Sequence, residues 1–287
     1  MSGINVLSVL DEVIEADEAL PKIRRLVLDL AVRGKLVDSL PADESVDALL
    51  HRVNAEKVRL VREKIVRKPA APNTIHDGDK PFLIPTGWKW VRFGSIAHFS
   101  AGRTPARHDL SYWNTGDHSW VSIGDMVDGG QVSATRETVS DKAKNEVFGS
   151  DPASPGTIIM SFKLTIGKIS RLTVPAFHNE AIVSIRPYIA ELDSYLFKVL
   201  PQFARLGTTK GAVKGATLNR ESIANILLPL PPLSEQERIV RRIDELMALC
   251  DSLDDELTTM RESRARLLDA VLYQALPASL VPAQAAQ

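Results

Sequence analysis

The sequence predicts an α+β protein in which a mixed α/β domain is combined with long helices of the coiled-coil type. Short β-type runs punctuated by Gly, Pro and Asp occupy the middle of the chain, and apolar residues recur at helical spacing on both sides of them. The 287 residues leave room for one large domain or two small ones. With 44% apolar and 25% charged residues, the composition is that of a folded globular protein and excludes a largely disordered or collagen-like chain.

Residues 1–68 are predicted to form a helical N-terminal region. Pro21 fits the first turn of a helix that Gly34 ends, and another helix is expected to start near Ser45. In each helical segment the apolar residues mostly recur every three or four positions. The first segment has Val6, Leu10 and Val13, the second has Ile23, Leu26 and Leu30, and the third has Val46, Leu49, Val53 and Leu60. Residues 69–81 are polar and rich in Pro and Gly, which predicts a linker.

Residues 82–228 are predicted to form a compact mixed α/β domain. Helical segments are expected near residues 194–206 and 219–225. The β-type runs are residues 89–93, 119–123, 157–162, 166–174 and 181–185. This segment has 16 Lys and Arg against 12 Asp and Glu, a net charge of +4, although the whole chain carries −1. A mildly cationic domain is therefore hidden within a neutral chain.

The C-terminal part begins with a Pro-rich junction, residues 229–233, and continues as one long helix over residues 234–276, followed by a flexible tail over residues 277–287. Ser234 and Glu237 have the spacing of a capping box. Nine of ten consecutive heptad positions are apolar, and we call these nine residues the seam: Ile239, Ile243, Leu246, Cys250, Leu253, Leu257, Met260, Leu267 and Val271. A stripe this narrow favours a coiled coil or a helical bundle, and about 40 residues at ~1.5 Å each give a rod of ~60 Å.

Signatures of catalysis are missing from the sequence. It has no phosphate-binding loop, no dinucleotide-binding glycine motif, no HExxH and no GxSxG, and its six histidines lack metal-ligand spacing. The single cysteine, Cys250, excludes an intrachain disulfide and a CxxC zinc site, and its seam position predicts a small buried apolar residue. With no secretory signal and no long apolar run, the sequence predicts a cytoplasmic binding module without a membrane span, a metal or a cofactor of its own.

Several segments resemble the specificity subunit of Type I restriction-modification enzymes. The most specific is LPPLSEQERIV at residues 230–240 with the long helix after it. IPTGWKW at residues 84–90 resembles the start of a target recognition domain in that family, and GRTP at 102–105, YW at 112–113 and WVSIGD at 120–125 follow in the family's order. Residues 20–36 resemble the leader of many such subunits.

The resemblance implies a non-catalytic subunit that recognises double-stranded DNA. It also implies partner methyltransferase (M) subunits, which bind S-adenosylmethionine and methylate adenine at N6, and restriction-translocase (R) subunits. Full-length members carry two recognition domains and two helical spacers, whereas this sequence has one of each, so we expect a half-size form that pairs through the seam. A homodimer would read a symmetric two-part site. The partner helix could also come from the N-terminal helices or from a different half-subunit.

The candidate DNA-binding residues lie in three segments. Arg103, Thr104 and Arg107 fall in a predicted loop, where arginine can contact guanine or phosphate. Ser161, Lys163 and Lys168 flank a β-type run, and Lys210 and Lys214 belong to a Gly-rich basic loop. For each of these residues a solvated surface role remains open, and Trp88 and Trp90 are expected to be core residues.

Two other functions remain open at this point. The chain could be an adaptor or regulator that sequesters methyltransferase subunits without reading a site. An intrinsic nuclease or transferase would need acidic metal clusters or a cofactor loop, and the sequence shows neither.

Overall fold

A computed structural model describes residues 19–41, 43–209 and 218–275. The chain divides into two compact units, residues 30–241 and residues 1–29 with 242–287. Each unit is described by itself. Within the described residues, no helix is both long and apolar enough to cross a membrane.

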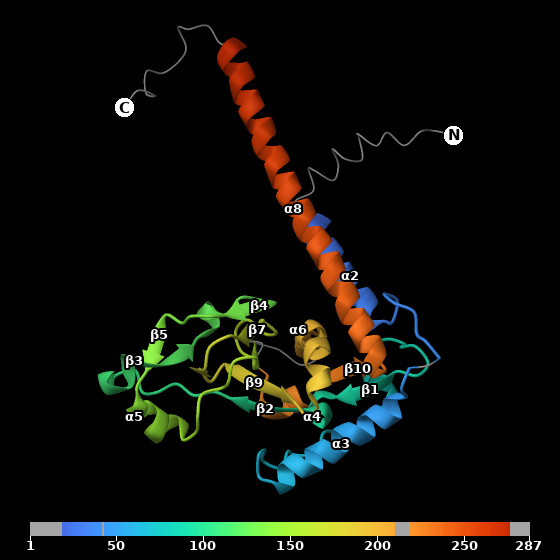
Figure 1. The fold of residues 1–287 in the computed structure, drawn as a ribbon, viewed down its shortest axis with the longest axis vertical. Helices are drawn as coiled ribbons and strands as arrows, with labels where there is room; N and C mark the ends of the chain where they lie inside the picture. The colour runs from blue at the N-terminus through green and yellow to red at the C-terminus, as the bar shows by residue number, and fades with distance from the viewer. Residues whose placement is uncertain (1–18, 42, 210–217, 276–287) are drawn as a thin grey trace. The chain divides into compact units, whose positions relative to one another are not determined.

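The larger unit contains three sheets, seen on the lower half of Figure 1. A five-stranded sheet has the order β2-β9-β6-β7-β4, a three-stranded sheet the order β5-β3-β8, and a two-stranded sheet pairs β1 with β10. The strands are β1 Lys89–Arg92, β2 Ala97–Ala101, β3 Trp113–Val121, β4 Gly130–Val132, β5 Glu137–Val139, β6 Ile158–Ser161, β7 Ile169–Leu172, β8 Ala176–His178, β9 Ile182–Pro187 and β10 Leu227–Leu230.

Most neighbouring strands run antiparallel, and two pairs run parallel. β9 lies between β2 and β6, antiparallel to both, while β4 pairs with β7 and β3 with β8 in parallel. The predicted runs at residues 89–93, 157–162 and 166–174 contain β1, β6 and β7, and those at 119–123 and 181–185 overlap β3 and β9. The strands β2, β4, β5, β8 and β10 were not predicted. The mixed α/β character of the middle segment is thus confirmed.

Two hydrophobic clusters support the three-stranded sheet and its neighbour. One contains Val121, Met126, Val132, Ile159, Leu172, Ala176 and Ile182. The other contains Trp113, Trp120, Val139, Ala143 and Phe177. Trp88 and Trp90 are also buried, as predicted for core residues. Because β3 contributes to both clusters, it is the strand that fixes the position of the residues discussed below.

Two helices of the larger unit, α3 and α7, begin at residues whose side chains cap them. Ser45 accepts a hydrogen bond from the Ala48 amide, and Asn219 accepts one from the Ser222 amide, so both act as N-caps. The longer helices are α3 Val46–Arg62, α6 Asp193–Thr209 and α7 Arg220–Ala224, with a turn of helix, α4 Phe93–Ile96, directly before β2. Shorter turns are η1 Asp77–Asp79, η2 Leu110–Tyr112, η3 Ile123–Asp125, α5 Asp141–Ala143, η4 Lys144–Phe148 and η5 Ala190–Leu192.

The predicted linker, residues 69–81, belongs to the larger unit and contacts it. The Asn73 amide donates to Oδ1 of Asn225 over 2.8 Å, and Asp79 forms an ion pair of 2.5 Å with Arg92. Residues 30–241, including α3, therefore form one compact unit across this segment.

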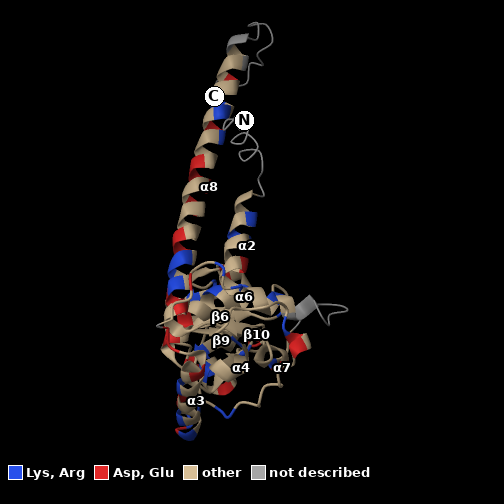
Figure 2. Ribbon diagram, turned by 90° about the vertical axis from the view of Figure 1, so that its right-hand side faces the viewer, with Lys and Arg blue, Asp and Glu red and all other residues tan. Residues whose placement is uncertain are grey.

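The long C-terminal helix is present as α8, Leu233–Ala275, which begins one residue before the predicted start at Ser234. Helix α2, Ala19–Val32, contains Pro21 in its first turn, and Gly34 follows it with φ +67°. In the smaller unit, α2 and α8 run antiparallel side by side, joined by a 2.7 Å ion pair between Arg24 and Asp251 (Figures 1 and 2). The N-terminal helix expected over residues 6–14 lies outside the described residues.

Candidate nucleic-acid interface

Residues 102–107, here called the recognition loop, are fastened by their main chain. The Gly102 amide donates to the Ile182 carbonyl over 3.1 Å, and the Arg103 amide donates to the His178 carbonyl over 2.9 Å. A methyl group at Gly102 would lie 2.5 Å from the Asn179 carbonyl oxygen and closer still to that of His178, so only glycine fits here. The loop is therefore fixed at its base without using the side chains it presents.

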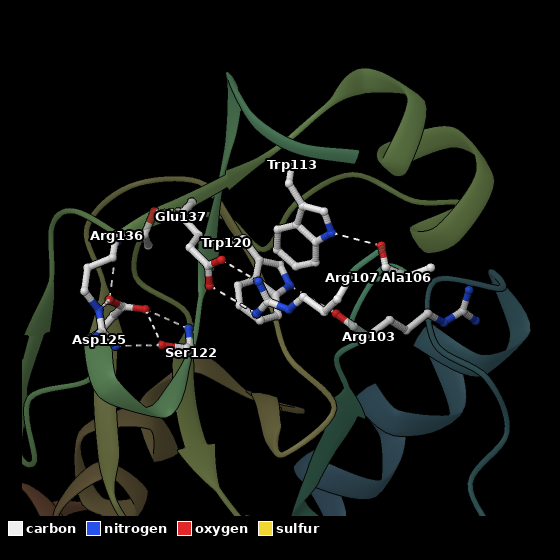
Figure 3. Close-up of polar contacts among 10 residues, drawn as sticks. Arg103, Ala106, Arg107, Trp113, Trp120, Ser122, Asp125, Arg136 and Glu137 are labelled. Atoms are coloured by element: carbon white, nitrogen blue, oxygen red, sulfur yellow. Dashed lines mark hydrogen bonds and ion pairs between the residues drawn. The ribbon is translucent and has the colours of Figure 1, made fainter. Parts of the chain in front are cut away.

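Two tryptophans of β3 hold the rest of the loop (Figure 3). The indole N–H of Trp120 donates to the Arg103 carbonyl, and the indole N–H of Trp113 donates to the Ala106 carbonyl, each over 3.1 Å. The two rings meet edge to face with centroids 5.0 Å apart, and both are buried. Each indole thus packs in the core and also satisfies a loop carbonyl.

Arg107 lies over these rings and remains accessible. Its guanidinium carbon is 3.9 Å from the Trp113 ring centroid and 4.9 Å from that of Trp120, within cation–π range. The guanidinium also forms a two-pronged ion pair with Glu137 of β5, with 3.1 Å between Nη2 and Oε2. The side chain is nevertheless 53% exposed. The stacking and the ion pair together hold a planar guanidinium in one orientation at the surface.

Glu180 brings three predicted residues together. Thr104 donates its hydroxyl to this carboxylate, which lowers the pKa of Glu180, and the charges of Lys163 and Arg107 lower it further. Arg103 is exposed and donates from Nη1 to the Val147 carbonyl. The structure therefore gathers Thr104, Arg107 and Lys163 around one carboxylate.

Ser161 does not belong to this surface. Its side chain is completely buried, and its hydroxyl donates to the Thr165 carbonyl and accepts from the Lys168 amide over 3.2 Å. The prediction that Ser161 presents a polar group to DNA is therefore wrong, because the hydroxyl closes the turn between β6 and β7. The ammonium of Lys168 donates to the Ile123 carbonyl over 3.1 Å, so this half-buried side chain braces a neighbouring turn.

Lys210 and Lys214 lie outside the described residues. The chain is described again at Leu218, whose amide donates to the Phe162 carbonyl over 3.0 Å, directly beside Lys163 in sequence. Both lysines remain candidates on sequence grounds.

The WVSIGD segment forms a closed turn beside the recognition loop. Asp125 accepts from the amide of Ser122 over 2.8 Å and from its hydroxyl over 2.6 Å, and it forms a 2.8 Å ion pair with Arg136. Although burial favours the neutral acid, these hydrogen bonds lower the pKa of Asp125. Arg136 and Glu137 are adjacent, so this turn also positions the partner of Arg107 (Figure 3). Sequence reasoning did not identify Glu137, Glu180 or Arg136 as members of the site.

The LPPLSEQERIV segment has a structural role in the larger unit. Glu235 and Gln236 are buried: Ser39 donates to Glu235 over 2.9 Å, and Gln236 donates to the Pro231 carbonyl over 2.8 Å. Arg238 forms a forked pair with Asp43 over 2.9 and 2.6 Å, which lowers the pKa of Asp43 to about 2. These contacts join the start of α8 to residues 38–43.

The seam is covered in its first part and exposed in its second. Ile239, Ile243 and Cys250 are at most 4% exposed within the chain itself, which confirms a buried Cys250 but leaves these three side chains unavailable to a second copy. Leu246 and Leu257 are half-buried. The later seam residues are exposed, Leu253 by 48%, Met260 by 49%, Leu267 by 68% and Val271 by 60%. Within the smaller unit, Arg24 of α2 pairs with Asp251, next to the buried Cys250.

In the part of the chain that the structure describes, no group of three or more His, Cys, Asp or Glu side chains could hold a metal ion. The arrangement just described presents fixed polar side chains on a rigid frame, which suits recognition of a ligand.

Comparison with known proteins identifies the family. A model of the Type I restriction modification DNA specificity domain matches residues 85–259. The specificity subunit of the Escherichia coli Type I restriction enzyme EcoAI is 31% identical over 275 residues, and that of EcoEI is 29% identical over 261 residues. Each alignment covers 88% of this chain and 43% of the relative, so the chain spans less than half the length of these relatives.

Solved structures show the same fold. A chain from a study of complex assembly and conformational transition in the type I R-M system aligns with a TM-score of 0.56 and 19% identity, covering 91% of this chain and 60% of that one. The HsdS subunit from Thermoanaerobacter tengcongensis aligns with a TM-score of 0.51 and 20% identity, covering 91% and 58%. Because the family model covers more than half of the chain, the chain belongs to the family of Type I restriction-modification specificity subunits.

Proposed function

We propose that this chain recognises a specific DNA sequence for a Type I restriction-modification complex and contacts the duplex with the recognition loop and Lys163. The observation that carries the proposal is the exposed guanidinium of Arg107, stacked on Trp113 and Trp120 and paired with Glu137. Arginine in a fixed orientation forms two parallel hydrogen bonds to guanine O6 and N7, or grips a phosphate. Family membership supports DNA as the ligand.

The rigid loop explains how selectivity would arise. Hydrogen bonds to its main-chain groups fix the loop before DNA arrives, so little ordering entropy is lost on binding. Lys163 adds a positive charge that positions the backbone, while Arg107 and Arg103 supply donors for base edges or phosphates. On contact with DNA, the Arg107 guanidinium exchanges Glu137 for an acceptor on the duplex.

The reaction itself belongs to partner polypeptides. Methyltransferase subunits carrying S-adenosylmethionine would methylate adenine within the selected site, and restriction-translocase subunits would join the same complex.

A homodimer through the exposed part of the seam is the second element of the proposal. Leu253, Met260, Leu267 and Val271 are apolar at heptad spacing on one face of α8 and exposed in the single chain. A second copy would cover them and place two identical recognition domains on a symmetric two-part site. Light scattering on the purified chain should show a dimer, and Met260→Asp with Leu267→Asp should shift it to monomer. A strictly monomeric wild type at micromolar concentration would refute the homodimer.

Methylation mapping tests the recognition function. The chain is co-expressed with the methyltransferase subunit of a Type I system that accepts it, and methylated adenines are mapped with and without the chain. A sequence-dependent pattern that requires the chain supports the proposal. Inhibition of methylation without any sequence preference would replace it with a sequestering adaptor.

A matched pair of variants then tests the interface. Arg107→Ala should reduce the preference for target over unrelated duplex by about 1–3 kcal/mol, or roughly 5- to 150-fold. The control is Arg171→Ala, because Arg171 also stacks on an aromatic ring, that of Phe197 at 5.0 Å, and pairs with a carboxylate, that of Asp193. If wild type and Arg107→Ala show the same preference for target over unrelated duplex at matched salt, the recognition loop is not the surface that reads the DNA.

A further inference from the structure

Two arginines of the recognition domain differ from its other cations. Among the Lys and Arg that the structure describes between residues 82 and 228, only Arg186 and Arg220 have no hydrogen bond, ion pair or ring contact, and both are exposed. The other Lys and Arg that the structure describes in this range have partners within the larger unit, among them Asp47 for Lys89 and Asp79 for Arg92. These two guanidiniums therefore keep their full capacity to donate to a ligand.

Arg186 lies on the five-stranded sheet, and Arg220 lies on the short helix α7. Arg186 of β9 is directly opposite His98 of β2, and the neighbouring pair on this face is Ser100 with Ser184, whose hydroxyls are 2.8 Å apart. Arg220 opens α7, which packs against α4, the turn directly before β2. We call His98, Ser100, Ser184, Arg186 and Arg220 the β2–β9 patch.

His98 is the residue of the patch that both arginines affect. Burial lowers the pKa of His98, and the charges of Arg220 and Arg186 lower it further. The carboxylate near Arg186 is Glu56 of α3, and Arg59 already occupies it with hydrogen bonds of 2.8 and 2.6 Å. The patch thus places two guanidiniums near an imidazole whose pKa is lowered, and the nearby Glu56 carboxylate is already bound by Arg59.

We propose that the β2–β9 patch binds backbone phosphates of the same DNA that the recognition loop reads. This inference rests on the proposed function. Like charges held near one another destabilise the folded domain, and an anionic ligand removes that cost. Arginine forks and serine hydroxyls are common phosphate ligands at protein–DNA interfaces.

Continuity with the recognition loop favours DNA over an acidic protein surface. β2 leads directly into the loop, and Arg103 lies five positions after His98. At ~3.3 Å per residue the strand covers at most ~17 Å, which is about five base pairs along the duplex axis and somewhat more than the ~12 Å width of the major groove. A loop in the groove and a patch on the adjoining backbone are compatible with this spacing.

The salt dependence of binding tests the patch. The variant is Arg186→Gln with Arg220→Gln, and the charge-matched control is Lys80→Gln with Lys89→Gln, since these lysines are exposed and paired with Asp77 and Asp47. Each protein is assayed in complex with its methyltransferase subunits on target and on unrelated duplex. Thermal unfolding checks that both variants are folded.

If the β2–β9 patch binds phosphates, its loss should weaken affinity for target and unrelated duplex equally. The double variant should bind both duplexes about 30-fold more weakly at 0.15 M salt, and its slope of log affinity against log salt should fall by about 2, or ~0.9 per phosphate contact. The control should match wild type. An unchanged slope, or a loss confined to the target duplex, would overturn the inference, as would failure to retain methyltransferase subunits while DNA affinity stays normal.

The outcome is separable from that of the proposed function. A wild-type complex without any sequence preference would refute specific recognition, but the slopes on unrelated duplex would still report whether Arg186 and Arg220 contact phosphate.

Discussion

Replacing Gly102 with alanine would disturb the base of the recognition loop without changing any side chain that we place on DNA. The new methyl group would lie 2.5 Å from the Asn179 carbonyl oxygen and nearer to that of His178, whereas ordinary contact begins at about 3.4 Å. The loop or the opposing backbone must therefore move by at least ~1 Å. The hydrogen bonds from the amides of Gly102 and Arg103, 3.1 and 2.9 Å long, would then stretch to about 4 Å, beyond bonding distance.

The energetic cost follows from these losses. Overpacking costs about 1–3 kcal/mol and two lost hydrogen bonds about 1 kcal/mol each, so we expect a loss of about 3–5 kcal/mol in the free energy of unfolding. For a domain of this size the loss corresponds to a Tm lower by roughly 6–20 °C. Affinity for target DNA should fall with it, since the displaced loop no longer holds Arg103 and Arg107 on the tryptophans.

Two further glycines provide controls for this substitution. Gly78 has open space around it and an ordinary φ, so Gly78→Ala should leave both stability and DNA affinity unchanged. At Gly94 the nearest atom is Cβ of Ala224 at 3.1 Å, so Gly94→Ala should give a smaller loss of stability than Gly102→Ala. Urea unfolding and DNA binding measure both effects. If Gly102→Ala unfolds at the same urea concentration as Gly78→Ala, the proposed steric role of Gly102 is refuted.

Three further predictions concern pH and the tryptophans. Burial lowers the pKa of His178 to about 4, so its NMR ring signals should not titrate between pH 8 and 5. The free energy of unfolding should decline by about 3 kcal/mol at most as pH falls from 6.5 to 4, because the unfolded chain takes up the proton first. A ring that titrates near pH 6.5 would contradict this prediction. Arg238 lowers the pKa of Asp43 to about 2, so the ion pair stabilises the folded chain above about pH 4 and this stabilisation is lost as pH falls through 2. In urea unfolding, the stability of Asp43→Asn should therefore fall less steeply with decreasing pH than that of wild type. An unchanged acid dependence would argue against the ion pair. Trp120→Phe keeps a ring beneath the loop but removes the donor to the Arg103 carbonyl, so the free energy of unfolding in urea should fall by about 1 kcal/mol. Affinity for the target duplex should fall more than affinity for an unrelated duplex. An equal loss on both duplexes would show that the loop does not specify sequence.

Elements with strong local signals could be predicted from the sequence. The heptad pattern without Pro or Gly predicts α8 to within one residue at its start, and Ser45 and Asn219 act as the caps of α3 and α7. These signals depend on neighbours a few residues away, so the sequence carries them without knowledge of the tertiary fold.

Short strands could not be predicted in this way. β4, β5 and β8 have three residues each, too few to show an alternating pattern. They form because longer strands, β7 and β3, offer them a paired edge. Tertiary pairing therefore decides their existence.

The candidate site was predicted in part. Arg103, Thr104 and Arg107 stand out as cations and a hydroxyl in one loop, but their partners Glu137 and Glu180 are 30 and 76 residues away along the chain. Ser161 was misassigned because a buried serine that closes a turn has the same sequence context as an exposed one. The first half of the seam is likewise core, since a heptad pattern does not reveal which helix covers it.

The way the recognition loop is fixed has a consequence for changing the DNA sequence that we propose the chain recognises. Its four anchors are the amides of residues 102 and 103 and the carbonyls of residues 103 and 106, all of them main-chain atoms. Side chains at positions 103, 104 and 107 can consequently be varied in a library while the scaffold beneath them stays intact. A selection for new methylation targets would then vary the side chains at these three positions while the main chain of the loop keeps its conformation.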